Sequence, residues 1–221
     1  MKPRRRFHGE IALMLGLATN ACAVAFFAKS DLGMSTLSLA SFVMHGIFPT
    51  LTLGTWSYII QCALILVLVA LIRRVSPGYI FSFCLAILYG LLIDLFSFLI
   101  AGLPTSLPAR VIYYLIGFSG LSMGTAFLIQ SEMPILPFDT FMREISVHFR
   151  ISYRRLRTWF DLSTVVVSAV LGWWRLGSFV GIGVGTLLNA LFIGQAVSRV
   201  ARFLDGRFQF EPRFAWFSRL R

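Results

Sequence analysis

The chain has 221 residues, of which 57% are hydrophobic and only 13% are charged. An average soluble domain carries about 25% charged residues, because its surface must face water. The composition therefore excludes an ordinary soluble globular protein and indicates a polytopic membrane protein. The net charge is +11, but the basic residues lie between apolar runs and at the chain ends rather than along one helix face. This pattern fits anionic lipid at a membrane surface, and a nucleic-acid partner is not expected.

Six apolar runs are long enough to form helices that cross a bilayer, since a crossing needs about 20 apolar residues. In chain order they cover residues 11–28, 54–72, 79–101, 111–130, 159–174 and 178–197. The fifth run is the shortest, and we expect its helix to extend into the preceding segment. The sequence thus predicts an all-α fold, a membrane bundle of six transmembrane helices.

The distribution of basic residues predicts how this bundle is oriented. All but three of the 20 Lys and Arg residues lie in the N-terminal segment, in the loops after the second and fourth spans, or in the tail. The three exceptions, in the opposite set of loops, are Lys29, Arg110 and Arg175. Because basic residues favour the cytoplasmic side, both termini are expected in the cytoplasm, with the protein in the inner (plasma) membrane. The first run also has features of a cleaved signal peptide, but its length favours a retained helix.

The two halves of the chain are weakly similar in register, which predicts an internal repeat. Trp56 precedes Trp159 by 103 residues, and residues 90–94 precede residues 185–189 by 95. Each repeat would cross three times, an odd number, so the second copy would enter the membrane from the opposite side. Inverted repeats of this kind build many secondary transporters. The expected parts are a basic N-terminal segment (1–10), a first repeat (11–101), a second repeat (111–200) and a basic, aromatic tail (201–221).

Each repeat contains a segment that is too short to cross, at residues 33–48 and 137–149. The apolar spacing in the second predicts an amphipathic helix of about three turns, with Asp139 placed to cap it. Ser35 or Thr36 is the equivalent cap in the first copy. Such short helices either lie at the interface or dip into the membrane and return, and both interpretations stay open. Only in the second case would their positive N-terminal ends point into the protein, where an anionic group could bind.

Several motifs of the second half resemble a known family. They are the Pro-Phe-Asp-Thr-Phe sequence at 137–141, Arg157 with Asp161, the glycine-rich stretch 181–186, and Gly194. Together they resemble the YczE/YyaS/YitT group of bacterial membrane proteins, over residues 10–200. The first half departs from the pattern, because Met34 and Ser35 stand where a Pro-aromatic-Asp sequence is expected. The resemblance implies a multi-pass inner-membrane protein of a kind often presumed to be a transporter, and it supplies no substrate.

Two polar residues at matching positions of the repeat lie within the expected spans. Asp94 lies in the outer half of the third span, and Asn189 is its mate in the sixth. A charged group in the hydrocarbon region costs about 2.5–3.5 kcal/mol on insertion scales, so an acid there is a candidate for function. Asp94 could bind a proton, a cation or a solute. The alternative is an aspartate satisfied by a hydroxyl or amide of a neighbouring helix.

A second set of candidates lies at the cytoplasmic mouth of the fifth span. Arg157 and Asp161 are four residues apart on one helix face and can pair directly. Such a pair could simply let the helix end enter the membrane cheaply. In a transporter, Arg157 could instead bind an anion, or the pair could open during transport. Together with Asp139 of the short helix they complete the set of substrate-binding or ion-coupling candidates.

The remaining glycines, polar residues, cysteines and histidines are typical of helix packing rather than of a binding or catalytic site. Gly181 and Gly185 have the spacing that lets helices approach closely, and Gly90 matches Gly185 in the repeat. Asn20 and Gln61 are lesser candidates that can simply bond between helices. The three Cys and three His residues show no metal-ligand spacing, so neither a metal nor a cofactor is expected.

The function predicted from these features is transport of a small solute of unknown identity, with ion coupling as one option. An enzyme is not expected, because no nucleophile–base pair or metal-binding carboxylate set is recognisable. Two alternatives stay open: a substrate-binding membrane subunit that needs an energising partner, and a non-transporting scaffold or regulator. The expected partners are the lipid bilayer and the solute, with a second copy of the chain or an energising subunit as further options.

Overall fold

The computed structural model describes residues 5–74, 76–131 and 136–211. Over these ranges it contains eight helices and two short strands, so the predicted all-α membrane bundle is confirmed as the fold class. The elements in chain order are β1 (Arg5–His8), α1 (Gly9–Ser30), α2 (Thr36–Ile47), α3 (Leu53–Ile72), α4 (Pro77–Leu99), α5 (Leu107–Gln130), α6 (Pro137–His148), α7 (Tyr153–Leu176), α8 (Val184–Arg207) and β2 (Phe208–Glu211).

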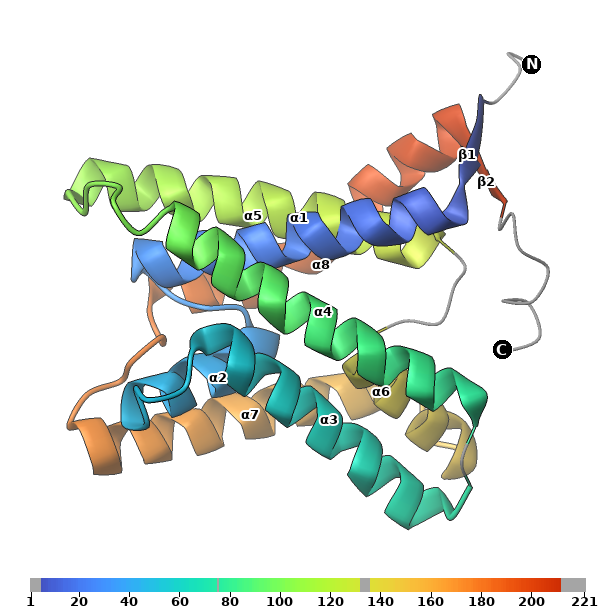
Figure 1. The fold of residues 1–221 in the computed structure, drawn as a ribbon, viewed down its shortest axis with the longest axis horizontal. Coiled ribbons are helices and arrows are strands. Elements are labelled where there is room, and N and C mark those ends of the chain that lie inside the picture. The colour runs from blue at the N-terminus through green and yellow to red at the C-terminus, as the bar shows by residue number, and fades with distance from the viewer. Residues whose placement is uncertain (1–4, 75, 132–135, 212–221) are drawn as a thin grey trace.

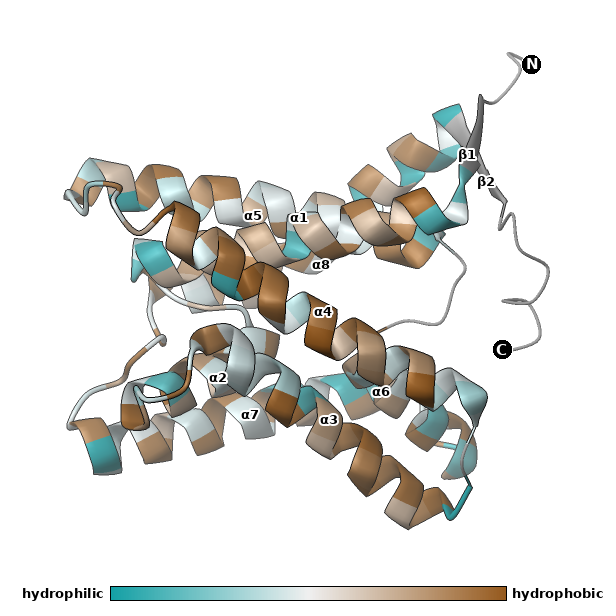
Figure 2. Cartoon of the chain, viewed as in Figure 1, coloured by the Kyte–Doolittle hydropathy of each residue, from teal (hydrophilic) through white to brown (hydrophobic). Residues whose placement is uncertain are grey.

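Five of the long helices are both long and apolar enough to cross a membrane: α1, α3, α4, α5 and α8. They make the chain an integral membrane protein, and Figure 2 shows hydrophobic residues along most of α3 and α4. α7 has 24 residues and begins at Tyr153, so the fifth predicted span does extend into the preceding segment. Its first half carries several arginines and Asp161, which lower its apolarity. A sixth crossing by α7 therefore stays a prediction.

The long helices alternate in direction across the molecule (Figure 1). The α3–α4 and α6–α7 connections lie at the same end as the two strands, and the α4–α5 and α7–α8 connections lie at the other. α1 packs along α5 over much of its length. Contacts between α1 and α4 correspond to those between α5 and α8, and contacts between α2 and α7 correspond to those between α3 and α6. This is the pattern that two related halves would give, although the six-span repeat itself remains a prediction.

The two short helices run outward from the interior of the bundle. In Figure 1, α2 runs from the middle of the molecule towards one end and α6 towards the opposite end. Apart from the exposed Val147 of α6, their apolar residues are buried or half-buried, and Leu39 and Met142 are fully enclosed. An interfacial helix would keep one face against lipid headgroups along its whole length. The packing therefore favours short helices that begin inside the bundle.

One part of the repeat pattern is not symmetric, and the sequence explains why. α3 packs closely along α4, because Gly54 and Gly90 place the two backbones in contact. At the offset of 103 residues that relates Trp56 to Trp159, Gly54 corresponds to Arg157. An arginine cannot sit in such a backbone contact. Accordingly, in the described part of the chain α7 does not pack along α8 as α3 packs along α4.

Of two predictions about the last third of the chain, one needs shifted bounds and one is wrong. The sixth span, expected at 178–197, corresponds to α8, which is long and apolar enough to cross, but α8 begins at Val184 and continues to Arg207, where β2 pairs in parallel with β1. Gly181 has a φ of +75° and lies in the turn before α8, so it cannot form a helix-packing motif with Gly185. Instead, both glycines bond to the segment between α1 and α2. Met34 N–H donates to the Gly181 carbonyl and Gly185 N–H donates to the Leu32 carbonyl, each at 2.9 Å. Of the predicted tail 201–221, residues 212–221 lie outside the described residues.

Candidate functional site

Three of the predicted candidates come together where α6 meets α7. The Arg157 guanidinium lies 3.2 Å from Asp139 of α6 and 3.4 Å from Asp161 on its own helix. Arg157 also donates to the Tyr153 hydroxyl at 3.3 Å and stacks over the Phe138 ring at 4.6 Å from its centre. We call Asp139, Arg157 and Asp161 the charged cluster. Each of its side chains is only about a third exposed or less, before any lipid is considered.

The charged cluster also reaches the other short helix. Thr36, the first residue of α2, donates its hydroxyl to Asp161 at 3.0 Å. Asp139 lies in the first turn of α6. The cluster therefore sits between the N-terminal ends of α2 and α6, whose positive dipole ends stabilise carboxylates. One ion-paired group thus ties together two short helices from the two halves and α7.

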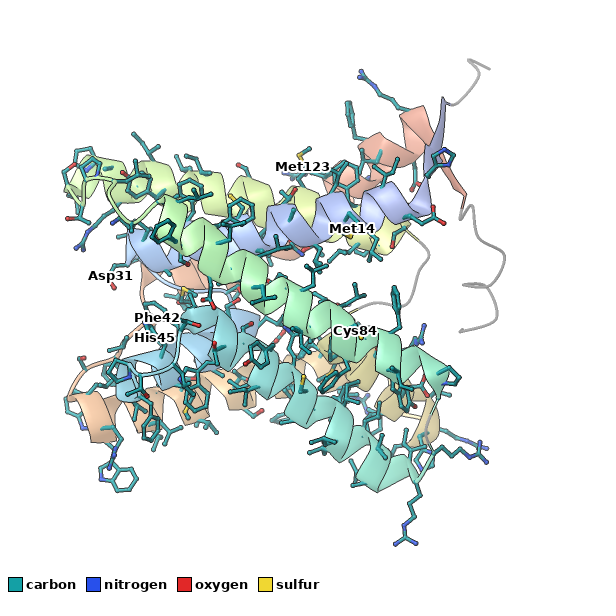
Figure 3. All side chains as sticks on the ribbon, in the orientation of Figure 1. Met14, Asp31, Phe42, His45, Cys84 and Met123 are labelled. Carbon is teal, nitrogen blue, oxygen red and sulfur yellow. The ribbon has the colours of Figure 1, made fainter. Side chains whose placement is uncertain are left out.

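The other ion pairs of the described residues lie at the surface. Arg110 pairs with Asp31 at 3.4 Å, with side chains 35% and 58% exposed, and Figure 3 shows Asp31 at the edge of the molecule, at the end of α1. Arg143 pairs with its neighbour Glu144 on α6. Only the charged cluster lies between helices within the described bundle, and this position makes it the main candidate for function.

Beside the charged cluster is a small cavity of about 50 Å³. It lies between α2, α3, α4, α6 and α7, and Thr36 borders both the cavity and Asp161. Its lining residues with polar side-chain groups are Thr36, Ser38, Ser41, Ser57, Gln61, Tyr89 and Thr164. Since one water needs about 10–15 Å³ on this measure, the cavity has room for a few water-sized molecules. We call it the polar cavity.

Gln61 is the residue of the polar cavity whose importance sequence reasoning missed. Its side chain is 5% exposed, and its Oε1 atom has no hydrogen-bond partner among the described residues. A buried amide oxygen without a donor is costly, about 1–3 kcal/mol, and marks a place where a ligand or water can bind. The available signal was the polar pair Ser57 and Gln61, four residues apart in an otherwise apolar span. That pattern places both side chains on one face of α3.

Asp94 does not join the charged cluster and instead caps α3. Its Oδ1 accepts the Gly54 N–H at 2.8 Å and its Oδ2 accepts the Thr52 hydroxyl at 2.6 Å. The carboxylate thus faces the positive end of the α3 dipole. Of the two interpretations of this residue, the contacts favour an aspartate satisfied by a neighbouring helix.

Replacing Asp94 with Ala is expected to lower stability rather than to change a binding site. The loss of a helix cap costs about 0.5–2 kcal/mol, and the carboxylate supplies a second acceptor beyond an ordinary cap. Thermal unfolding in detergent should show a lower Tm for Asp94→Ala and a smaller decrease for Asp94→Asn, which keeps an acceptor oxygen. Equal Tm values for all three proteins would contradict the capping role.

Asn189 also lies apart from the charged cluster. It is 2% exposed, and its Oδ1 accepts the Tyr114 hydroxyl at 3.3 Å, while its Nδ2 has no partner among the described residues. The same hydroxyl donates to the Gly185 carbonyl at 2.8 Å. Asn20 of α1 accepts from Thr125 of α5 at 3.5 Å, which fits its expected role between helices. Within the described residues, no group of three or more His, Cys, Asp or Glu could hold a metal ion.

Comparisons with known proteins give a family and no activity. A family model described as a family of unknown function, DUF6198, matches residues 7–202. An uncharacterised protein of Haemophilus influenzae is 29% identical over 145 residues, which cover 66% of this chain and 62% of that protein. No solved structure matches the chain. The resemblance to the YczE/YyaS/YitT group is not confirmed by these matches.

Proposed function

From the premise that the chain belongs to the DUF6198 family, whose function is unknown, we propose that it is a transporter of a small solute. The observation that carries this proposal is the polar cavity beside the charged cluster, at the point where α2 and α6 begin. In secondary transporters, solute sites lie where broken helices from two inverted halves meet. The arrangement of α2 and α6 supports the same design here.

In this transporter, the contacts of the charged cluster would hold the closed conformation. α7 carries Arg157 and Asp161, which hold α6 through Asp139 and α2 through Thr36. If one half moves relative to the other, the Thr36–Asp161 bond must break or exchange partners, because it joins the first half to the second, whereas Asp139 and Arg157 both belong to the second half. Opening of this single contact beside the polar cavity would expose the cavity to one side of the membrane.

The orientation proposed for this transporter has both termini in the cytoplasm. The end of the molecule with the strands and the α3–α4 and α6–α7 connections carries Arg73, Arg74 and Arg150 (Figure 1). The opposite connections hold few basic residues, and this asymmetry supports the assignment. In this orientation α2 ends on the outer side and α6 on the cytoplasmic side.

Solute uptake into proteoliposomes tests the proposal. A panel of charged and uncharged small solutes should include at least one that enters vesicles with the wild-type protein faster than protein-free vesicles. Asp161→Asn weakens both the Arg157 pair and the Thr36 bond, so the same solute should move at a clearly altered rate. Arg175→Gln, on the exposed end of α7, is the matched control and should behave as wild type.

One result would contradict transport by this chain alone, and another would contradict the role of the charged cluster. If no solute of the panel enters faster than it enters empty vesicles, and the purified protein carries an ATPase subunit, the chain is a binding subunit. If uptake occurs but is the same for Asp161→Asn and wild type, the charged cluster is not part of the transport path.

A further inference from the structure

The polar cavity has no charged lining. Among the described residues that border it there is no Lys, Arg, Asp or Glu. Thr36, which lines the cavity, joins it to the charged cluster through its bond to Asp161. The chemistry of the ligand therefore depends on whether that cluster leaves an unbalanced charge beside it.

The charges of the cluster are balanced without a ligand. Two carboxylates and one guanidinium leave a formal charge of minus one if all three are ionised. The N-terminal ends of α2 and α6 each contribute the equivalent of about half a positive charge. The sum is close to zero, so neither a cation nor an anion is needed in the cavity for electrostatic balance. Moving an unpaired ion into it would carry a large desolvation cost.

The hydrogen-bonding groups of the cavity require a ligand that carries both a donor and an acceptor. Gln61 Oε1 lacks a donor among the described residues, and the hydroxyls of Ser41 and Ser57 can donate or accept. Thr36 and Leu37, in the first turn of α2, border the same cavity. The backbone N–H groups at this end of α2 can donate hydrogen bonds. A ligand that satisfies these groups together must itself carry donors and acceptors.

We infer that the polar cavity takes a small uncharged solute that both donates and accepts hydrogen bonds, such as an amide or a polyol, rather than an inorganic ion. This inference rests on the proposed transport function and names the class of its solute. Gln61 is then the residue that selects the solute, because its amide oxygen is the buried atom of the cavity that lacks a hydrogen-bond partner among the described residues. The charged cluster positions α2 and α6 around the cavity and does not touch the solute.

Uptake of four isotope-labelled probes, urea, glycerol, sodium and chloride, tests the inference in proteoliposomes. Urea or glycerol should enter faster than in protein-free vesicles, and Gln61→Leu should reduce that rate about fivefold or more, since the hydrogen bond at a buried group is lost. Ser57→Ala, a milder change on the same face of α3, should give a smaller reduction. Gln130→Leu applies the same substitution outside the cavity and should leave uptake unchanged.

The outcomes separate this inference from the transport proposal. Uptake of sodium or chloride that depends on Gln61 would overturn the uncharged class and leave transport intact. Uptake of urea or glycerol that is the same in the Gln61→Leu, Ser57→Ala and wild-type proteins would overturn the role of the cavity. If none of the four probes moves, the inference fails; transport fails with it only if the wider solute panel also shows no uptake.

Discussion

An Arg157→Met variant is expected to lose more stability than any other single charge variant within the described bundle. Arg157 neutralises two carboxylates, Asp139 at 3.2 Å and Asp161 at 3.4 Å, and Met keeps the apolar stem of the side chain without its charge. Removing one partner of a buried ion pair costs about 3–5 kcal/mol, because the remaining charge is left without a partner. The side chains are about a third exposed, so we expect about 3 kcal/mol, at the lower end of that range. Thermal unfolding in detergent would measure the change.

A second substitution distinguishes the loss of charge balance from the loss of packing. Adding Asp139→Asn to Arg157→Met removes one unpaired carboxylate, so the double variant should be more stable than the single one. Arg175→Met, at the exposed end of α7, is the control and should lie within about 0.5 kcal/mol of wild type. A double variant that is less stable than Arg157→Met would contradict the view that an unpaired carboxylate causes the loss of stability.

A Gly54→Leu variant is the second change with a large expected effect. A Cβ atom at Gly54 would overlap the carbonyl oxygen of Gly90 and come within 2.6 Å of the Asp94 carboxyl carbon. The neighbours are backbone and a hydrogen-bonded carboxylate, so they cannot move aside cheaply. Overpacking a well-packed interior costs about 1–3 kcal/mol, occasionally more, and here α3 and α4 must separate and the cap of α3 is lost as well.

The matched control for this variant is Gly102→Leu. A Cβ at Gly102 meets nothing within 4 Å, and the residue lies in the loop after α4. The Tm of Gly54→Leu should fall well below that of Gly102→Leu, and Gly54→Ala should fall between them. If Gly54→Leu and Gly102→Leu had the same Tm, the backbone contact between α3 and α4 would be refuted.

Helix positions and the charged cluster were accessible from sequence for simple physical reasons. Apolar runs define membrane helices because the bilayer excludes unpaired polar backbone. Arg157 and Asp161 were expected to pair because their spacing places them on one helix face, and the structure confirms that pairing. Asp139 was expected to cap the short helix, and this part of the prediction is wrong: α6 begins at Pro137 with Leu136 as its N-cap, and Asp139 lies in the first turn instead.

What sequence could not supply is the contact between distant segments. The bond between Thr36 and Asp161 joins residues 125 positions apart, and no local pattern encodes it. Asp94 stood out because an acid in an apolar span is costly, yet spacing alone could not show that Thr52 and Gly54 satisfy it. Gly181 was assigned to a helix by its spacing. Its positive φ instead belongs to the turn before α8, where its carbonyl accepts a bond from the loop after α1. Gln61 acquires its significance only from the cavity that five helices form around it.

In the proposed arrangement, α2 and α6 enter the bilayer from opposite sides and begin beside each other within it. Phe48 and Phe149 immediately follow these two helices, and both side chains are exposed, which makes them a matched pair for labelling. Leu37, in the first turn of α2, reports on the inner end. Each would be changed to Cys in a background without Cys22, Cys62 and Cys84, and treated with a membrane-impermeant maleimide from either side of oriented vesicles.

Entry of α2 and α6 from opposite sides predicts labelling of Phe48→Cys from the outer side only, labelling of Phe149→Cys from the cytoplasmic side only, and protection of Leu37→Cys from both. Labelling of Phe48→Cys and Phe149→Cys from the same side, or labelling of Leu37→Cys as fast as Phe48→Cys, would contradict it.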